Sequence, residues 1–374
     1  MGEPGRLGCG PAAAWVNHDV AQCYLVREGY NLFMRPLLHP ALVNGRFGDP
    51  ALFIETLFER RAIMFDIGDI STLPPRKILR VEHVFVSHAH IDHFIGFDHL
   101  LRLLVGREKT VRLYGPSGFI EQVHHKLSAY RWNLIDRFEF DLVFVAMEIG
   151  SDLAFRTAKM RLKNAFAPEA VGSGALRDGV IYREPTFCVT GAVLEHRTPC
   201  LGFALEEAVH VNVWKSRLSE LGLPVGAWLH ELKRAVVENR PDDYPISVGS
   251  KPKTSPEGLM PLVELRSVMT VTPGQKVGYV TDVADTPANR QAIVRLIRHA
   301  DVLFIEAAFA DADAALAAER AHLTTTAAGA VAREAGVRRV EPFHFSPRYS
   351  GQEERLLQEV MAAFSGQGPQ KYGP

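Results

Sequence analysis

Short apolar runs rich in β-branched and aromatic residues recur through the first half of the chain. Such runs are typical of buried strands, and we expect strands over 61–69, 81–88, 110–116 and 140–149. Apolar residues at helical spacing between these runs predict helices over 97–107 and 116–134. The first half therefore alternates between the two kinds of element.

The middle of the chain is less regular, and the last third returns to alternation. We expect a loop or mobile hairpin over 171–179, two short helices around a Gly-Pro turn over 213–236 and an exposed loop over 239–258. Strands over 276–282, 301–309 and 338–346 enclose a helix over 288–300 and an Ala-rich helix. Alternating strands and helices predict layered α/β packing, and we expect one domain, 1–374, with an inserted arm.

Composition sets further bounds. The chain has 374 residues, a hydrophobic content of 47% and a formal net charge of −1, so overall charge does not argue for nucleic acid, although a local basic face is compatible with it. The cysteines (Cys9, Cys23, Cys188 and Cys200) form no CxxC pair, which fits a reducing cytosol. Neither a signal peptide nor a membrane-spanning run is evident, and we expect a cytoplasmic protein without membrane contact.

Candidate chemistry is concentrated in "SHAHIDH", at the end of the strand predicted over 81–88. In an extended segment residues i and i+2 project to the same side, so His88 and His90 can meet one metal. Asp92 and His93 follow after a turn and can reach a second centre. Imidazole and carboxylate suit zinc and related divalent ions, whereas the alternative is a polar loop with unrelated histidines.

The H-x-H-x-D-H spacing resembles the first motif of the metallo-β-lactamase superfamily. The resemblance implies a four-layer αββα sandwich with the site at one rim, and three further ligands downstream in the order His, Asp, His. His196, Asp282 and His344 meet that order, and each follows an apolar strand-like run. Asp282 alone would be equally well explained as a turn or helix-cap residue.

The resemblance also implies how two divalent ions, expected to be zinc, divide these ligands. His88, His90 and His196 would hold one ion, and Asp92, His93 and His344 the other. Asp282 would bridge both, and Asp92 counts among the catalytic residues as well. Two metals roughly 3.5–4 Å apart can activate a shared water for attack on phosphorus. Iron and manganese also suit imidazole and carboxylate ligands.

The C-terminal third resembles ribonuclease Z, the endonuclease that trims the 3′ ends of tRNA precursors. The matching motifs are "GYVTD", "DVLFIEAAF", "HLT" at 322–324 and "HFSPRY" at 344–349. By this resemblance His322 donates a proton to the leaving oxygen and Glu306 orients or charges it. Arg348 and Ser346 would contact phosphate, although Arg348 as an ordinary ion-pair residue and Thr324 as a helix cap are competing interpretations.

A second family feature is an arm that grips the tRNA body. Residues 205–250 lie in the matching place, with a Gly226-Ala227 step where the family has Gly-Pro. The basic residues expected to contact phosphates are Lys215, Arg217, Lys233 and Arg234. A solvated helical hairpin packed on the domain is the alternative.

The resemblance predicts a homodimeric endoribonuclease that cuts the 3′ trailer from tRNA precursors by attack of metal-activated hydroxide on a phosphodiester. The alternative is a small-molecule hydrolase on the same scaffold, such as a phosphodiesterase, arylsulfatase-like enzyme or lactonase. An arm that projects favours a macromolecule, and an arm that covers the metals favours a small substrate. A non-catalytic RNA-binding protein is a third interpretation. The segment 31–56 and the insertion around 150–185, which carries a small basic run (Arg156, Lys159, Arg161 and Lys163), depart from the family pattern.

Overall fold

The computed structural model describes residues 38–56, 61–248 and 258–367. The N-terminal stretch with Cys9 and Cys23 lies outside these residues. The first half of the chain forms an eight-stranded sheet whose strand order follows the sequence. Its strands are β1 (Leu38–Leu42), β2 (Leu52–Thr56), β3 (Ala62–Phe65), β4 (Val81–Phe85), β5 (Lys109–Pro116), β6 (Leu142–Ile149), β7 (Ala154–Arg161) and β8 (Pro168–Ala175).

A six-stranded sheet contains most of the strands of the second half. Its order is β18 (Val340–Phe343), β17 (Val302–Glu306), β16 (Lys276–Val280), β11 (Thr198–Glu207), β10 (Phe187–His196) and β9 (Val180–Arg183). Strands β16, β17 and β18 are parallel, whereas β10 and β11 form a tight antiparallel hairpin. The parallel strands are joined by α8 (Pro287–Ile297), α9 (Ala314–Arg320) and α10 (Thr325–Glu334).

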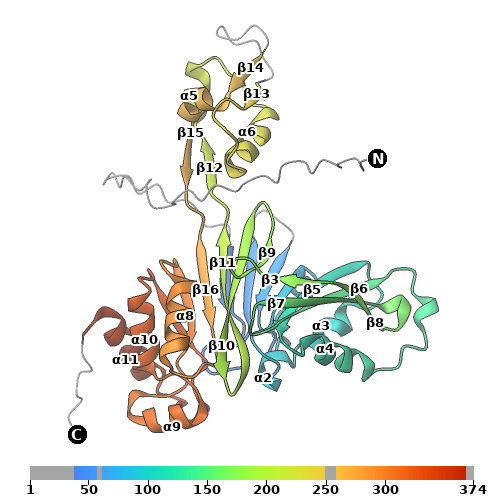
Figure 1. Ribbon diagram of the computed structural model, residues 1–374, viewed down its shortest axis with the longest axis vertical. Helices are drawn as coiled ribbons and strands as arrows, with labels where there is room; N and C mark the ends of the chain where they lie inside the picture. Colours follow the sequence, from blue (N-terminus) through green and yellow to red (C-terminus); the bar gives the residue numbers. More distant parts are fainter. Residues whose placement is uncertain (1–37, 57–60, 249–257, 368–374) are drawn as a thin grey trace, which may run out of the picture. The chain divides into compact units, whose positions relative to one another are not determined.

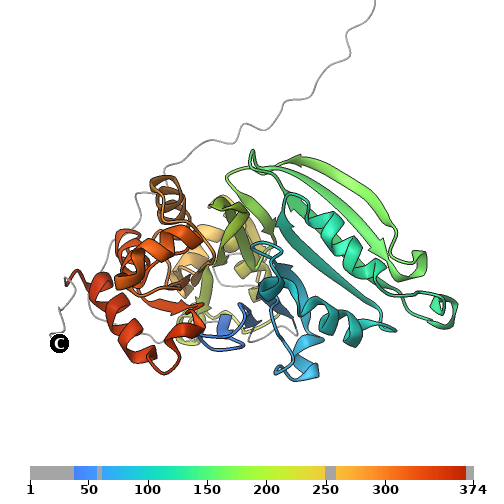
Figure 2. The same cartoon turned by 90° about the horizontal axis from the view of Figure 1, so that it is seen from below.

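Three apolar cores separate four layers (Figure 2). One core lies between the eight-stranded sheet and the helices α1 (Pro75–Ile78), α2 (Ile91–Phe94), α3 (Phe97–Leu104) and α4 (Phe119–Ser128). A second lies between the two sheets and includes the stacked rings of Phe65, Phe203 and Tyr279. The third lies under α8, α10 and α11 (Glu353–Ser365). The expected αββα sandwich is therefore confirmed.

The segment between β11 and β16 leaves the sandwich and builds a small unit with its own core (Figure 1). Its elements are β12 (His210–Val213), α5 (Lys215–Glu220), α6 (Trp228–Val237), β13 (Pro245–Ser247), β14 (Leu259–Pro261), α7 (Leu262–Leu265) and β15 (Met269–Thr272). Strands β12 and β15 pair as a two-stranded stalk, and Trp228 and Leu232 are buried within the unit. We call residues 208–274 the stalked unit.

Two expectations of the sequence were wrong in part. The loop expected over 171–179 begins as the end of β8, because this edge strand is held by backbone pairing with β7 while all eight of its residues stay exposed. The loop expected over 239–258 contains β13, whose Ile246 is buried in the core of the stalked unit. The other expected strands and helices are present, with ends that differ by a few residues. Within the described residues, no helix has the length and apolar character needed to cross a membrane.

Candidate metal centre

The H-x-H-x-D-H cluster lies where β4 ends and α2 begins. His88 and His93 are buried, while His90 is exposed at the helix start and Asp92 is half-buried. The Nε2 atom of His88 lies 2.8 Å from the Nδ1 atom of His90. As expected for residues i and i+2, these two rings converge.

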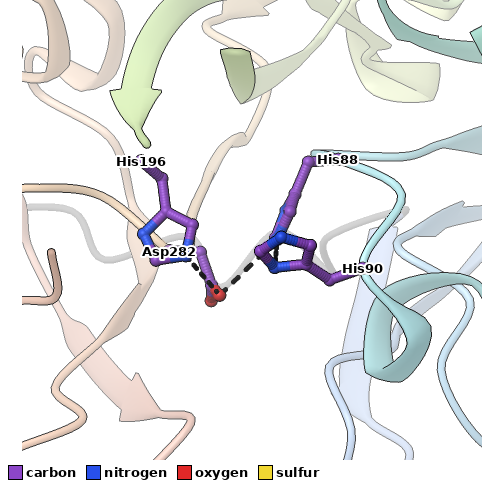
Figure 3. Close-up of side chains that lie close together, drawn as sticks. All are labelled: His88, His90, His196 and Asp282. Carbon is purple, nitrogen blue, oxygen red and sulfur yellow. Dashed lines mark hydrogen bonds and ion pairs between the residues drawn. The ribbon is translucent and has the colours of Figure 1, made fainter. Parts of the chain in front are cut away.

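The three predicted downstream ligands meet this cluster. His196 ends β10, Asp282 follows β16 and His344 follows β18, so strand ends from the second sheet reach the end of β4. The side chains of His88, His90, His196 and Asp282 converge on one point (Figure 3), and their ligand atoms lie within 4.8 Å of one another. A group of the same tightness contains Asp92, His93 and His344.

The carboxylate of Asp282 lies between the two groups. Its Oδ2 atom is 3.6 Å from His88 Nε2 and 3.5 Å from His196 Nε2. Its Oδ1 atom is 3.4 Å from His93 Nε2 and 3.1 Å from His344 Nδ1. One oxygen therefore faces each group, which is the arrangement that a bridging carboxylate requires. The helix cap before α8 is Thr286, so capping does not account for Asp282.

The donors fit divalent metal ions. Among the described residues, His93 Nε2 and His344 Nδ1 are buried nitrogens without a hydrogen-bond partner, and such atoms are costly unless something binds them. Asp92 Oδ2 lies 3.5 Å from Nε2 of both His93 and His344. Imidazole nitrogen and carboxylate oxygen are suitable ligands for zinc and related ions.

Burial and neighbouring charges shift the pKa values of His88 and His93 in opposite directions. Burial and the nearby imidazolium charge of His93 lower the pKa of His88 to about 2, so its ring is neutral. Burial opposes a charge on His93, but the carboxylates of Asp282 and Asp66 outweigh it and raise the pKa of His93 to about 10. A ligand imidazole must be neutral, so a metal that binds His93 displaces a proton.

Asp66, which is not among the residues predicted from the sequence, orients His93. Its Oδ2 atom lies 2.8 Å from His93 Nδ1 and accepts hydrogen bonds from Tyr279 and Ser87, each at 2.8 Å. Its Oδ1 atom accepts from the Ser87 backbone N–H at 2.6 Å. This carboxylate is buried and fixes which nitrogen of His93 faces Asp282, as outer partners of metal-binding histidines commonly do.

Replacing Asp66 with asparagine is expected to lower metal affinity about 10- to 100-fold, because an amide cannot accept every bond that this carboxylate accepts. Competition with a chromophoric chelator measures the change. Tyr279→Phe is the matched control, since it removes one hydroxyl from the same network and should have a smaller effect. Equal affinity in folded Asp66→Asn and wild-type protein would show that Asp66 is not needed to position His93.

A histidine–glutamate pair lies beside the two groups. His322 Nδ1 is 2.8 Å from Glu306 Oε2, and Glu306 Oε1 accepts from the Val283 backbone N–H at 2.6 Å. Burial opposes a charge on His322, but Glu306 outweighs it and raises the pKa of His322. These two residues, with Asp282 and His344, form a third set close enough for a metal, and His322 Nδ1 already contacts Glu306.

The centre opens into a cleft of about 690 Å³. Arg348 and Ser346, which the sequence predicts to contact phosphate, line it, and Arg348 also lies 3.9 Å from Asp313 and over the Phe309 ring. Arg197 and Arg320 line it too and were missed. Neither follows a recognisable motif, although Arg197 comes directly after the ligand His196. Thr324 caps α10, where its hydroxyl accepts from Ala327 N.

Several residues of the centre have left-handed backbone conformations that non-glycine residues rarely adopt. The φ angles are 53° at Asp66, 46° at Asp282, 50° at Arg197 and 59° at His344. Asp66, Arg197 and His344 each directly follow a strand. Asp282 follows β16 after one further residue. Such conformations cost about 1–3 kcal/mol each and cluster at functional sites.

The four basic residues expected to bind tRNA lie in the stalked unit, and none lines the cleft. Lys215 and Lys233 line one surface depression of about 380 Å³ between α5 and α6. Arg217 instead donates to Ser267 O at 2.7 Å and lies over the Trp214 ring, so it holds the unit together. Arg234 is exposed on α6.

The chain is similar to known proteins over most of its length. A model described as beta-lactamase superfamily domain matches residues 68–239 and 244–345. Ribonuclease Z of Synechocystis is 30% identical over 295 residues, covering 77% of this chain and 74% of that protein. Ribonuclease Z of Deinococcus radiodurans is 29% identical over 307 residues, covering 81% and 88%. The crystal structure of the short form of human tRNase Z is 18% identical, with a TM-score of 0.48 over 84% of this chain and 92% of that one.

Proposed function

We propose that this chain, which belongs to the beta-lactamase superfamily and within it to the ribonuclease Z family, is an endoribonuclease that removes the 3′ trailer of tRNA precursors. The observation that carries the proposal is the Asp282 carboxylate, one oxygen toward each ligand group, with the His322–Glu306 pair beside it. The full set of candidate metal ligands and the His322–Glu306 pair favour an enzyme over an RNA-binding protein without catalytic activity.

The residues take the following roles. His88, His90 and His196 would hold one ion, Asp92, His93 and His344 would hold the other, and Asp282 would lie between the two. When bound, two divalent ions lower the pKa of a water and stabilise charge on a phosphodiester. Burial opposes a charge on Asp92, but before an ion binds the positive charges of His344 and His93 outweigh it and lower the pKa of Asp92 to about 2, so this residue is already a carboxylate.

His322 is the proton donor for the leaving ribose oxygen. Glu306 holds it at Nδ1, which leaves Nε2 of this partly exposed ring available to the cleft. A proton donor must be charged before it acts, and Glu306 keeps it so by raising its pKa. Arg348 and Ser346 at the cleft, with Arg197 and Arg320, provide donors for phosphate oxygens.

The structure of the stalked unit favours a macromolecular substrate over a small one. It has its own core, and none of its described residues (208–248 and 258–274) lines the cleft, which favours an arm over a lid. We take residues 205–250, most of them in this unit, as a substrate-binding arm inserted into one domain, 1–374. Lys215 and Lys233, which line one depression, provide cationic groups for RNA phosphates, with Arg217 and Arg234 on the same helices.

Replacing both Lys215 and Lys233 with alanine is expected to raise KM for a tRNA precursor and leave hydrolysis of bis(p-nitrophenyl) phosphate unchanged. Removal of two phosphate contacts should also lower the slope of log affinity against log salt by about two. Precursor binding measured at several salt concentrations tests this. Lys77→Ala is the control, because Lys77 pairs with Glu55 on the sandwich. Equal slopes for the double variant and wild type would exclude these lysines from binding.

The pair of ions is proposed to be zinc, because five of the seven ligands are imidazoles and the rest carboxylates. The assembly is proposed to be a homodimer, and the exposed Ile91 on α2 and Ile95 directly after it provide an apolar surface for one. The compartment is proposed to be the cytoplasm, in keeping with the free thiols of Cys188 and Cys200.

The proposed function is tested by comparing kcat/KM for a 3′-extended tRNA precursor, the mature tRNA and bis(p-nitrophenyl) phosphate. We expect the precursor to be preferred over the small ester by several orders of magnitude and the mature tRNA to remain uncut. Efficient hydrolysis of the small ester with no cut in the precursor would favour a small-molecule hydrolase instead.

A further inference from the structure

The loop from Val43 to Pro50, between β1 and β2, departs from the ribonuclease Z pattern and has no role in the centre described above. The Arg46 side chain ties it to the C-terminal half, where it reaches the Pro342 carbonyl and lies 2.7 Å from Glu341 Oε2. The Phe345 backbone N–H, next to the ligand His344, donates to Arg46 O at 2.9 Å.

The same loop is tied to the N-terminal half. Asn44 Nδ2 donates to Asp69 O at 2.7 Å, and Gly68 N donates to Pro50 O at 3.0 Å. Gly68 packs directly against the Asp92 backbone, since a Cβ atom added there would lie 2.3 Å from Asp92 O. The loop is therefore fixed to both halves of the molecule at the edge of the cleft, beside Asp92.

Three phenylalanines line the cleft, and they differ in what they can offer a ligand. Phe309 is 7% exposed, with Arg348 above its ring and His322 5.9 Å from it between centroids. Phe345 is 1% exposed. Phe47 is only partly buried and meets Phe345 edge to face at 5.4 Å. Of the three, Phe47 alone combines a held ring with accessible surface.

We propose that Phe47 is a stacking platform for the nucleobase on the 3′ side of the scissile phosphate, the first base of the trailer. The inference rests on the proposed function. An aromatic ring held by its neighbours at the edge of a cleft with cationic groups is the usual combination for binding a single-stranded nucleotide, because every base has a face that stacks.

The position of His322 indicates on which side of the scissile phosphate the Phe47 ring lies. The leaving oxygen stays with the nucleotide on the 5′ side and takes its proton from His322, whose ring lies 4.7 Å from that of His196. His322 also lies 5.6 Å from His344, measured between ring centroids, so it faces both ligand groups from one side. The Val43–Pro50 loop is fixed beside Asp92 through Gly68, and we assign the nucleotide on the 3′ side to this loop and the nucleotide on the 5′ side to the neighbourhood of His196 and His322.

A double-mutant cycle between Phe47 and the base tests the inference. Precursors with a normal or an abasic nucleotide at the first trailer position are cut by zinc-loaded wild type and by Phe47→Ala, Phe47→Leu and Phe47→Tyr. We expect the abasic site to lower kcat/KM of wild type about tenfold and that of Phe47→Tyr similarly. Phe47→Ala and Phe47→Leu should be slow on the normal precursor and lose little more on the abasic one, since stacking is already absent. Metal content and thermal unfolding show whether each variant is folded.

Independent losses from Phe47→Ala and the abasic site would overturn the inference, as would equal behaviour of Phe47→Leu and wild type. Coupling at the last tRNA nucleotide instead of the first trailer nucleotide would overturn the assigned side. If wild type does not cut the precursor, the proposed function fails separately. The same cycle is then run on a dinucleotide and its counterpart lacking the 3′ base, and absence of coupling there rejects Phe47 as a base platform.

Discussion

Replacing Asp282 with asparagine is expected to reduce metal content and to slow phosphodiester hydrolysis about a thousandfold or more. The carboxylate is buried between the imidazoles of His88, His196, His93 and His344, at 3.1 to 3.6 Å. An amide carries no charge and has one acceptor atom, so it cannot serve both groups. The positive charges of the two ions would then lack the anion between them.

Metal content per chain and the rate on bis(p-nitrophenyl) phosphate measure this effect. Asp285→Asn is the matched control: it removes a carboxylate from the same loop, but Asp285 faces Arg290 at 3.1 Å and does not line the cleft. A folded Asp282→Asn protein with two ions per chain and a rate within tenfold of wild type would contradict the bridging role.

Replacing His322 with glutamine is expected to slow precursor cleavage about 100- to 10,000-fold while both metals remain bound. The ribose oxygen is a poor leaving group and needs a proton, which His322 alone is placed to give among the cleft residues described. An ester whose leaving group is p-nitrophenolate departs without a proton, so its hydrolysis should change little. The contrast between the two substrates separates proton donation from damage to the metal centre.

The pH dependence of precursor cleavage provides an independent test of proton donation by His322. Glu306 raises the pKa of His322 against the effect of burial, so the donor form persists into neutral solution. The rate of precursor cleavage should fall as the pH rises through that raised pKa, because the donor loses its proton. The same fall should be missing from p-nitrophenyl ester hydrolysis. Equal losses on both substrates in His322→Gln would contradict the assignment.

The convergence of the predicted ligands could be foreseen from the sequence for a physical reason. His196, Asp282 and His344 each follow an apolar run, and the ends of adjacent strands in an α/β fold meet at one edge. Asp66 also follows such a run, but an aspartate there is equally typical of a turn. Its partners Ser87 and Tyr279 lie 21 and 213 residues away, so the sequence gives no local signal of the network.

Two other features depend on contacts that no local pattern encodes. The Val43–Pro50 loop has neither helical nor alternating periodicity, and its position is set by Arg46, which reaches residue 341 from 295 residues away. Strand β8 is Gly-, Ser- and Ala-rich, and its side chains bury nothing, so only backbone pairing with β7 defines it. Hydrophobic periodicity reflects the burial of side chains in helices and strands. It does not predict segments that are defined by distant polar contacts or by backbone pairing.

Cleavage of a 3′-extended tRNA precursor in ¹⁸O-labelled water tests the central claim most directly. We expect metal-dependent production of tRNA with a 3′-hydroxyl end, and a trailer whose 5′-phosphate carries one labelled oxygen, since water attacks phosphorus and the ribose 3′-oxygen leaves. A 2′,3′-cyclic phosphate or a 3′-phosphate on the tRNA product would contradict this, because the 2′-hydroxyl would then be the nucleophile or the other ester oxygen the leaving group.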